Sequence, residues 1–388
     1  MIQRRQMLRT VSLAAGLAVL AGCKVIPRGP AESAPPPRPE TETPSGGILP
    51  SDSQRHRVAL LVPMSGANAA VGQSIANATT MALIDTDAKS LRITTYDTAT
   101  GAQSAAARAI ADGNKLILGP LLGDDVKTVA SVARPARVPM ITYSNDIGVA
   151  APDVFVLGHV PGQAVERVVS YAKAKGMGRF GALIPAGEYG QRASAAFFSS
   201  VRNAGGTIVA TETYDRGNTS VASAARRLKT KGPFDSILIA DTSRVSVQAA
   251  PLLKATGAAS PRILGNELWS GESAIMSSPA LRGAWFASVS DARFRQFVSS
   301  YRSRFGSQPH RIATLGYDSV LLTIRIARDW RPGSAFPTSK LFDRGGFLGL
   351  DGAFRFARNG VAERSLEVRE VTAGSVSVVS PAPARFND

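Results

Sequence analysis

Cysteine and histidine are scarce in this sequence. Cys23 is the single cysteine among 388 residues, which excludes an intrachain disulfide and a metal cluster built on several cysteines. The three histidines stand in unrelated contexts: His56 closes a proline-rich stretch, His159 lies between two regular segments, and His310 follows a proline at a helix start. We expect these side chains to be structural or solvated, and we predict no metal site.

Motifs of common enzymes are missing as well. The chain contains no G-x-S-x-G nucleophile elbow, no H-E-x-x-H zinc motif and no EF-hand loop. Neighbouring carboxylates occur at Asp124-Asp125, but Asp124 is explained as the N-cap of a predicted helix. We therefore predict a protein that is not an enzyme and that needs no cofactor.

Basic residues outnumber acidic ones, and the net charge is +16 at pH 7. No dense Lys/Arg cluster with interleaved aromatic residues occurs, so we do not expect nucleic-acid binding. Outside the cytoplasm, such a chain meets anionic lipids, cell-wall polymers and acidic proteins instead. The alternative is that the arginines cover a solvated surface. Hydrophobic residues make up 44% of the chain and charged residues 19%, which is typical of a globular protein.

The apolar run near the amino terminus is too short to cross a bilayer. The basic segment MIQRRQMLRT precedes the run VSLAAGLAVLAG, an order typical of a signal peptide, which we predict over residues 1–22. A buried first helix is the alternative, and the proline-rich stretch that follows disfavours it. The pair Arg4-Arg5 resembles a twin-arginine export signal, although ordinary Sec export is favoured.

The segment Leu20-Ala21-Gly22-Cys23 resembles a bacterial lipobox. The resemblance implies that the Cys23 thiol receives a diacylglyceryl group, that the chain is cut before it, and that the new amino terminus is acylated, with palmitate for example. More than one acyl chain gives stable membrane anchoring. Lys24 stands where an aspartate retains some lipoproteins in the inner membrane, which favours the inner leaflet of the outer membrane.

A proline-rich tether follows the predicted lipidation site. Residues 23–56 are rich in Pro, Ser, Glu and Gly, a composition that favours extended polyproline II at about 3 Å per residue. Such a spacer can hold a folded body several tens of ångströms from a membrane. The alternative is that the prolines form a ligand for a partner domain.

The rest of the chain alternates short apolar runs with helical patterns. Runs such as RVALLVP, KLILGP and RFGALIP have little polar alternation, as in strands of a parallel sheet that is covered by helices on both faces. We predict an α/β protein of two lobes, each a mostly parallel sheet flanked by helices. The predicted boundaries are residues 57–158 plus 291–346 for the first lobe and 159–290 plus 347–388 for the second lobe.

The carboxyl-terminal segment has a different pattern. The stretch GAFRFARNGVAERSLEVREVTAGSVSVV predicts a β-meander with turns at Asn359-Gly360 and Ala373-Gly374.

Ligands of parallel α/β sheets bind at the carboxyl ends of the strands, beside helix N-termini. The first such loop contains Ser65 and Gly66, whose hydroxyl and backbone N–H groups could hold a carboxylate or a sugar hydroxyl; the alternative is that they only form the turn. This loop lacks the Gly-Lys-Ser/Thr and G-x-G-x-x-G signatures of phosphate binding. The loops predicted at this edge span residues 63–72, 120–124, 144–152, 185–190, 241–246 and 265–272.

Four segments together resemble the type 1 periplasmic-binding-protein fold, which includes the receptors for branched-chain amino acids. They are VALLVPMSGANAAVGQSIANA, LILGPLLGDDVKTVASVARPARVPMITYSN, EYGQRASAAFFSSVRNAGGTIV and QPHRIATLGYDSVLLT. The resemblance covers residues 57–380. It implies two α/β lobes joined by three connections, which we expect near residues 158–161, 287–292 and 344–350.

Within that fold, the sequence is most similar to the penicillin-binding protein activator lipoproteins, the LpoA-like group. The segment GPLLGDDVKTVA, the lipobox and the tether carry this resemblance. It implies a protein that stands on the outer membrane, reaches through the peptidoglycan and stimulates a bifunctional peptidoglycan synthase. The best-studied members also have an N-terminal helical-repeat domain, where this chain has only the proline-rich tether.

The resemblance to amino-acid receptors implies a partly retained ligand pocket. In the second loop Gly123 replaces a hydroxyl residue, and in the third loop the run is Ser144-Asn145-Asp146, whose added acid would repel a carboxylate. Tyr189 matches an aromatic stacking position, and Glu267 matches an acid that meets an amino group. Asp241 starts a further loop at this edge. The alternative is a cleft lining that holds no ligand.

Two functions follow from these observations. The first is a non-catalytic lipoprotein that regulates peptidoglycan synthesis by binding a penicillin-binding protein. The second is a receptor that delivers an amino acid or another small polar molecule to an ABC transporter. A sensor that combines both, with ligand-driven closure of the lobes altering partner binding, is a third arrangement. The incomplete amino-acid pocket and the long tether favour the first.

Overall fold

The computed structural model describes residues 54–254, 260–383 and 386 of the chain. The predicted signal peptide, Cys23 and the tether up to residue 53 lie outside these residues. The described residues belong to one compact unit. His56, which the sequence analysis placed in the tether, is instead the first residue of β1 (His56–Val62), and its buried ring stacks on Trp330 at a centroid distance of 4.1 Å.

A five-stranded parallel sheet organises the first lobe, with the strand order β2-β1-β3-β4-β5. In β1 the side chains of Val58, Leu60 and Val62 face one layer of helices, whereas Ala59 and Leu61 face the other. Both faces are therefore buried, as the apolar runs predicted. The other strands are β2 (Leu91–Asp97), β3 (Leu116–Leu118), β4 (Met140–Thr142) and β5 (Val154–Val156).

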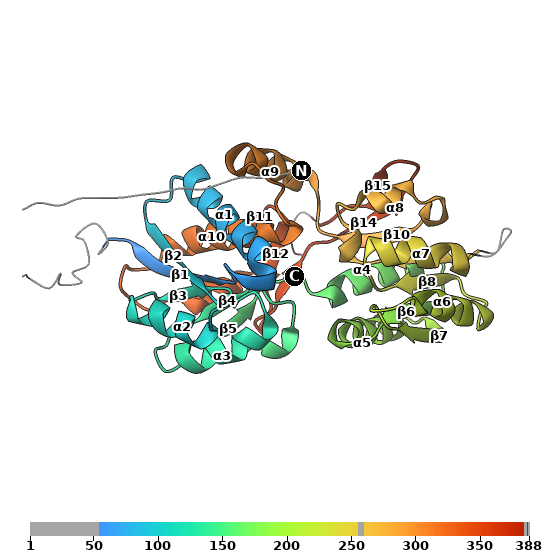
Figure 1. Ribbon diagram of the computed structural model, residues 1–388, viewed down its shortest axis with the longest axis horizontal. Coiled ribbons are helices and arrows are strands. Elements are labelled where there is room, and N and C mark those ends of the chain that lie inside the picture. Colours follow the sequence, from blue (N-terminus) through green and yellow to red (C-terminus); the bar gives the residue numbers. More distant parts are fainter. Residues whose placement is uncertain (1–53, 255–259, 384–385, 387–388) are drawn as a thin grey trace, which may run out of the picture. The chain divides into compact units, whose positions relative to one another are not determined.

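Helices cover both faces of this sheet (Figure 1). One face is covered by α1 (Ala69–Asp85) and α10 (Thr314–Ala327), and the other by α2 (Ala102–Ala111) and α3 (Gly123–Ala133). Helix α3 begins at Gly123 with Leu122 at the N-cap, so the prediction of Asp124 as the N-cap is wrong. Asp124 and Asp125 lie in the first turn, where carboxylates interact favourably with the helix dipole.

A seven-stranded sheet organises the second lobe, with the order β15-β14-β10-β9-β8-β6-β7. The neighbours from β10 to β7 are parallel, and β14 and β15 add antiparallel strands at one edge. The strands are β6 (Arg179–Pro185), β7 (Thr207–Tyr214), β8 (Ser236–Ile239), β9 (Arg262–Gly265), β10 (Trp285–Ser288), β14 (Glu367–Val371) and β15 (Val376–Ser380). Helices α4 (Pro161–Ala174) and α5 (Glu188–Asn203) cover one face, and α6 (Ser220–Thr230), α7 (Ser243–Leu253) and α8 (Ser273–Ser277) cover the other.

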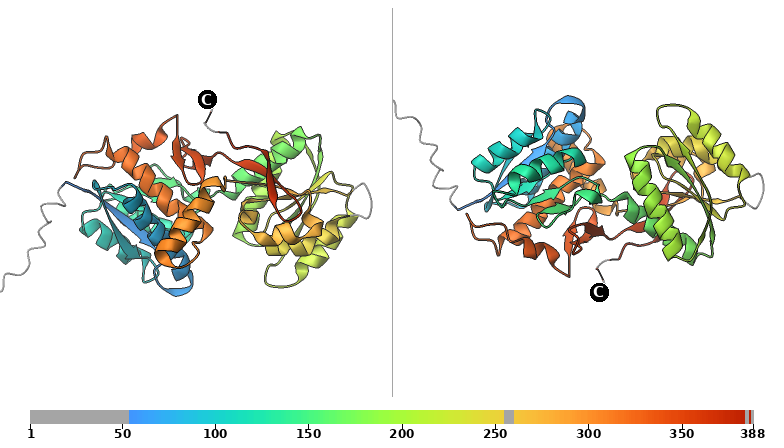
Figure 2. Two further views of the ribbon diagram at one scale, coloured as in Figure 1. Left: turned by 90° about the horizontal axis from the view of Figure 1, so that it is seen from above. Right: turned by 90° about the horizontal axis from the view of Figure 1, so that it is seen from below.

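A small third sheet changes the predicted boundary between the lobes. Strands β11 (Phe347–Gly349), β12 (Gly352–Phe356) and β13 (Ala362–Arg364) form it, and their side chains pack in the same core as β1. Residues 347–364 therefore lie with the first lobe, whereas the sequence analysis assigned them to the second. Figure 2 shows this segment beside the five-stranded sheet, while the red strands β14 and β15 lie in the other sheet.

The predicted β-meander is in fact two separate hairpins. Strands β12 and β13 pair antiparallel around the turn at Asn359-Gly360, and β14 and β15 pair around residues 372–375. The break between the hairpins, at residues 365–366, is the third connection between the lobes, so its predicted place near 344–350 is wrong. The other two connections run at 157–160 and 289–291, within the predicted regions.

Both lobes use one glycine to bring a helix against the end of a strand. A Cβ atom on Gly72, in α1, would lie 1.8 Å from the carbonyl oxygen of Pro63. A Cβ atom on Gly190, in α5, would lie 1.6 Å from the carbonyl oxygen of Pro185. Only glycine permits either approach. The loops after β1 and β6 are thereby held close to their strands, at the edge where ligands of such sheets bind.

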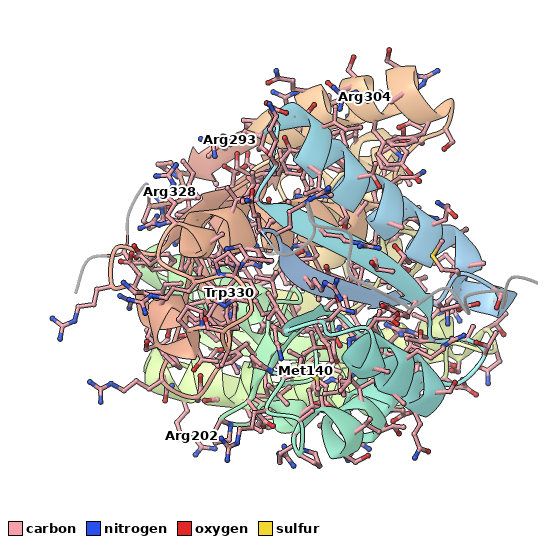
Figure 3. All side chains as sticks on the ribbon, turned by 90° about the vertical axis from the view of Figure 1, so that its left-hand side faces the viewer. Met140, Arg202, Arg293, Arg304, Arg328 and Trp330 are labelled. Atoms are coloured by element: carbon pink, nitrogen blue, oxygen red, sulfur yellow. The ribbon has the colours of Figure 1, made fainter. Side chains whose placement is uncertain are left out.

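The basic residues are spread over the outside of the protein. Figure 3 shows Arg202, Arg293, Arg304 and Arg328 at the periphery, while Met140 and Trp330 lie inside. Arg293 and Arg304 belong to helix α9 (Ala292–Phe305), which packs Phe297 and Tyr301 inward and ends at Gly306 with a φ of 71°. Within the described residues, no helix is long and apolar enough to span a membrane.

Candidate functional site

A cavity of about 800 Å³ lies between the carboxyl ends of the strands of both large sheets. The first lobe lines it with residues that follow β1, β3 and β4, and the second lobe with residues that follow β8, β9 and β10. Side chains from all three connections complete its wall, among them His159, Val289 and Arg364. The position agrees with the edge at which the sequence analysis expected ligand contacts.

The first loop uses Ser65 and Gly66 to form its turn. The Ser65 hydroxyl donates to Asp97 at 2.7 Å, and the backbone N–H of Met64 donates to the same carboxylate at 2.8 Å. The Met64 bond, followed by the Ser65 bond, lowers the pKa of Asp97 against the opposing effect of burial. Gly66 is exposed, with a φ of 70°. The same loop contributes Asn68 and Val71 to the cavity wall.

The second and third loops brace one another. A Cβ atom on Gly123 would lie 3.3 Å from Ser144 Oγ, and that buried hydroxyl accepts a bond of 3.1 Å from the Asp146 backbone N–H. The Asp146 carboxylate accepts from the backbone N–H of Gly148 at 2.9 Å and lies 3.8 Å from Arg192 Nη1 in the second lobe. The acid that was expected to repel a ligand is thus engaged locally. Asn145, between these two residues, lines the cavity.

Tyr189 and Glu267, predicted independently, are in direct contact. The Tyr189 hydroxyl donates to Glu267 Oε1 at 3.1 Å and accepts a bond of 2.7 Å from Asn266 Nδ2. Burial raises the pKa of Glu267 to about 7, although the Tyr189 bond opposes the rise. Glu267 lines the cavity, and its second oxygen, Oε2, is buried without a hydrogen-bond partner.

Asp241 holds an arginine over the Tyr189 ring. Its fully buried carboxylate accepts from the Tyr214 hydroxyl and from Arg216 Nε at 2.9 Å. The Arg216 guanidinium then lies 5.0 Å from the centroid of the Tyr189 ring. Asp241 thereby holds Arg216 in place next to Tyr189, and the residues that follow it, Thr242 to Arg244, line the cavity.

Sequence analysis missed a group of charged side chains at the connections. His159, Arg311, Asp351 and Arg364 form what we call the connection cluster. The buried Asp351 carboxylate accepts from Arg311 Nη1 at 2.6 Å and pairs with His159 Nε2 at 2.8 Å, while Arg364 Nη1 lies 4.0 Å away. His159, Arg311 and Arg364 all line the cavity.

The electrostatics of the connection cluster favour a charged Asp351 and a neutral His159. Burial alone would raise the pKa of Asp351, but the charge of Arg311, together with the hydrogen bond from His159 and the charge of Arg364, outweighs it and lowers that pKa. Burial, with the nearby Arg364 charge, lowers the pKa of His159. The charged Asp351 therefore lies between two guanidinium groups.

Polar atoms without partners gather around this cavity. Nε and Nη2 of Arg311, Nε and Nη1 of Arg364, and Oε2 of Glu267 are buried and have no hydrogen-bond partner among the described residues. Unpaired buried polar groups cost roughly 1–3 kcal/mol each. Local sequence patterns do not mark this group, because His159 and Asp351 are 192 positions apart and meet only in the fold.

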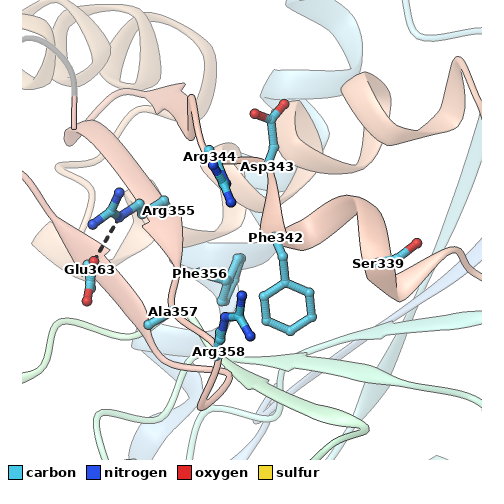
Figure 4. Close-up of a pocket in the computed structure, with 9 residues that line it drawn as sticks. All are labelled: Ser339, Phe342, Asp343, Arg344, Arg355, Phe356, Ala357, Arg358 and Glu363. Atoms are coloured by element: carbon cyan, nitrogen blue, oxygen red, sulfur yellow. Dashed lines mark hydrogen bonds and ion pairs between the residues drawn. The ribbon is translucent and has the colours of Figure 1, made fainter. Parts of the chain in front are cut away.

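A second cavity, of about 700 Å³, lies on the surface of the first lobe (Figure 4). Arg344, Arg355 and Arg358 line it together with the aromatic rings of Phe342 and Phe356. Arg355 is paired with Glu363 at 2.9 Å. The lining comes from β12, β13 and residues near 340, so this cavity is separate from the strand ends that form the first one.

Neither cavity provides a metal centre. In the part of the chain that the structure describes, no group of three or more His, Cys, Asp or Glu side chains is arranged to hold a metal ion.

Comparisons with known proteins give a consistent fold. A family model described as a periplasmic binding protein matches residues 56–375. An uncharacterized protein of Rickettsia prowazekii is 28% identical over 173 residues, which are 44% of this chain and 46% of that protein, so the match spans less than half of this curated relative.

Two solved structures illustrate the range of proteins that share this fold. A leucine-binding protein from Thermotoga maritima matches with a TM-score of 0.64 and 21% identity, over 84% of this chain and 98% of that one. Full-length LpoA from Haemophilus influenzae matches with a TM-score of 0.65 and 17% identity, over 84% of this chain and 59% of that one. At these identities the likeness is one of fold.

Proposed function

Since the chain belongs to the periplasmic binding protein family, we propose that it works outside the cytoplasm and binds a small polar molecule in the cavity between its two large sheets. The observation that carries this proposal is the set of buried, unpartnered polar atoms of Glu267, Arg311 and Arg364 around one cavity. We further propose that the protein performs no catalysis.

The cavity is suited to a ligand because both lobes and their connections contribute to it. Glu267 belongs to the second lobe, Asn68 and Asn145 belong to the first, and Arg364 precedes the third connection. A bound molecule would satisfy donors and acceptors from each part, which is how binding energy can favour one arrangement of two lobes over another. Buried polar groups without a hydrogen-bond partner cost free energy, so a ligand that forms hydrogen bonds with them removes this cost on binding.

Thermal melting of the full-length chain in detergent tests this proposal. The panel contains amino acids, dicarboxylic acids, aromatic acids, phosphate and neutral sugars. A ligand present at 100 times its Kd should stabilise the fold by about 2.7 kcal/mol. Glu267→Gln should reduce that shift, whereas Glu166→Gln, which removes an exposed carboxylate from α4, should not. A panel without a single stabilising compound would count against a binding function.

A second candidate function is activation of a peptidoglycan synthase, a penicillin-binding protein. The lipobox at Cys23 and the proline-rich tether favour it, and the fold is shared with LpoA. In this case the lipid anchor holds the body at the outer membrane and the partner binds its surface, where the basic cavity around Phe342 offers an aromatic contact outside the first cavity.

Cross-linking in cells followed by purification of the full-length protein separates the two candidates. Recovery of a peptidoglycan synthase supports the activator function, and recovery of a permease alone supports delivery to a transporter. Cys23→Ala should abolish incorporation of labelled palmitate and release the protein from membranes. Retention of both label and membrane binding in that variant would exclude anchoring through Cys23.

A further inference from the structure

We propose that the part of the cavity next to the connections is a subsite for an anionic group, formed by Arg311 and Arg364. The inference rests on the proposed binding function and names the chemistry of the ligand. The ligand carries a carboxylate or a phosphate group, whose oxygens accept from guanidinium N–H groups.

Arg364 is built into the wall of the cavity. Its side chain is only 2% exposed, and its Nη2 is fixed by donation to the Leu157 carbonyl oxygen at 2.7 Å. Nε and Nη1 have no hydrogen-bond partner among the described residues, because Asp351 Oδ2 lies 4.0 Å from Nη1. The guanidinium lies 5.3 Å from the centroid of the Phe354 ring, which limits its freedom to turn elsewhere. These two free donors lie on different edges of the guanidinium, so each can donate to a separate acceptor oxygen.

Arg311 supplies a second pair of donors beside the first. It is the first residue of a short 3-10 turn (Arg311–Ala313) before α10, and its Nη1 is held by Asp351. Nε and Nη2 are buried without a hydrogen-bond partner, and Nη2 lies 3.8 Å from Asp291 Oδ1. The guanidinium also rests on the Phe294 ring, 4.1 Å from its centroid.

The carboxylates at this end of the cavity leave donors of both arginines unused. Asp351 pairs with Arg311 and lies 4.0 Å from Arg364 Nη1, whereas Asp291 and Glu367 both pair with Arg369. Asp318, which is also fully buried, accepts from the backbone N–H of Leu350 at 2.6 Å. An anion would occupy the free N–H groups of Arg311 and Arg364.

The other end of the cavity has the opposite character. Glu267 presents an acceptor there, and Ser243 donates to Glu272 at 3.0 Å on the same wall. A ligand with an acidic group at the arginines would therefore place a hydrogen-bond donor, such as an ammonium or hydroxyl group, near Glu267. Arg244, an exposed arginine at the start of α7, is the competing position for the acidic group.

Calorimetric titration of the full-length chain tests the subsite with matched probes. L-glutamate is compared with its diamide, succinate with succinamide, and inorganic phosphate with the two acids at constant ionic strength, so that each amide lacks every carboxylate of its acid. We expect an acidic probe to bind and its neutral amide to bind at least about tenfold more weakly, the effect of losing a charged hydrogen bond. Binding of the carboxylic acids alone indicates a carboxylate site, and binding of phosphate alone indicates a phosphate site.

Substitutions locate the subsite. Arg364→Met should weaken binding of the acidic probe at least about tenfold and leave the amide unchanged, whereas Arg328→Met removes an exposed arginine and should change neither. If the methionine variant does not fold, Arg364→Lys replaces it in this test because lysine keeps the positive charge. The lysine variant should still bind acids more tightly than amides, but with lower affinity than the unsubstituted protein.

Four outcomes would overturn the inference. Equal binding of acids and amides, or an effect of Arg244→Met in place of Arg364→Met, removes the anion subsite but leaves the binding function standing. Binding of neutral sugars alone would likewise remove the anion subsite and leave the binding function standing. If no compound of either panel binds, the proposed function fails together with the subsite.

Discussion

The unusual state of Glu267 gives a prediction that needs no knowledge of the ligand. Burial raises the pKa of this carboxyl from 4.5 to about 7, against the effect of the Tyr189 bond. We consider Glu267→Gln, because glutamine keeps an oxygen that accepts from the Tyr189 hydroxyl and cannot ionise. The substitution therefore isolates the free energy of charging this side chain inside the protein.

The sign and size of the effect follow from linkage. Between pH 4.5 and about 7 the folded protein binds more protons at Glu267 than the unfolded chain does, so this group lowers stability as pH rises through that window. The full penalty is on the order of 3 kcal/mol and is present above pH 7. The glutamine variant lacks it. We expect the two proteins to differ little near pH 4.5 and the variant to be more stable by up to about 3 kcal/mol at pH 8.

Urea-induced unfolding at pH 4.5, 6, 7 and 8 measures this difference, with the fluorescence of buried tryptophans such as Trp269 as the signal. Asp318 has a raised pKa for a related reason, burial and then the charge of Asp351, but it contributes equally to both proteins and cancels in the comparison. A difference that stays constant across this pH range would refute the raised pKa of Glu267.

Three further predictions concern the framework of the site. Asp351→Asn leaves Arg311 and Arg364 without their buried counter-charge and should lower the free energy of unfolding, measured in urea, by about 3–5 kcal/mol. The control Asp153→Asn breaks the exposed pair with Arg134 and should cost about 1 kcal/mol or less. Equal losses in the two variants would contradict the role of Asp351 as a buried counter-charge. Gly72→Ala should prevent or severely weaken folding, as followed by circular dichroism, because its Cβ would meet a backbone carbonyl, whereas Gly66→Ala faces open space and should cost about 1–2 kcal/mol for its positive φ. Phe354→Ala should cost about 3–5 kcal/mol if the third sheet completes the core of the first lobe, and a loss below about 1 kcal/mol would argue that it does not.

Local patterns in the sequence predicted most of the regular structure. The apolar run before Pro63 forms β1, and the run RFGALIP forms β6. Such strands depend on neighbouring residues, because burial on both faces requires an uninterrupted apolar run. The α/β class with two large sheets followed from the same signals.

The lobe boundary was misplaced because it depends on distant partners. Strands β11 to β13 and strands β14 to β15 have similar hairpin patterns, and their sequences do not indicate which sheet each set joins. Phe347, Phe354 and Phe356 belong with the first lobe because they fill its core beside β1, nearly 300 residues earlier in the chain. Sequence periodicity reports burial without identifying the neighbour.

Sequence patterns located part of the cavity wall and missed the rest, because they do not identify distant partners. Asn145 and Glu267 lie on its wall, and Tyr189 contacts Glu267, because the carboxyl ends of strands can be located from the strand pattern. The connection cluster could not be located in this way. His159 and Asp351 are separated by 192 positions and meet only when the chain has passed between the lobes.

The late return of the chain to both sheets has a consequence for how the protein is made. The first lobe needs β13, which ends at Arg364, and the second needs β14 and β15, which end at Ser380. A ribosome must therefore synthesise almost the entire polypeptide before either lobe has all of its strands. Until then the emerging chain keeps open sheet edges and cannot complete its cooperative core. That delay keeps the nascent protein incompletely folded until its synthesis is almost complete.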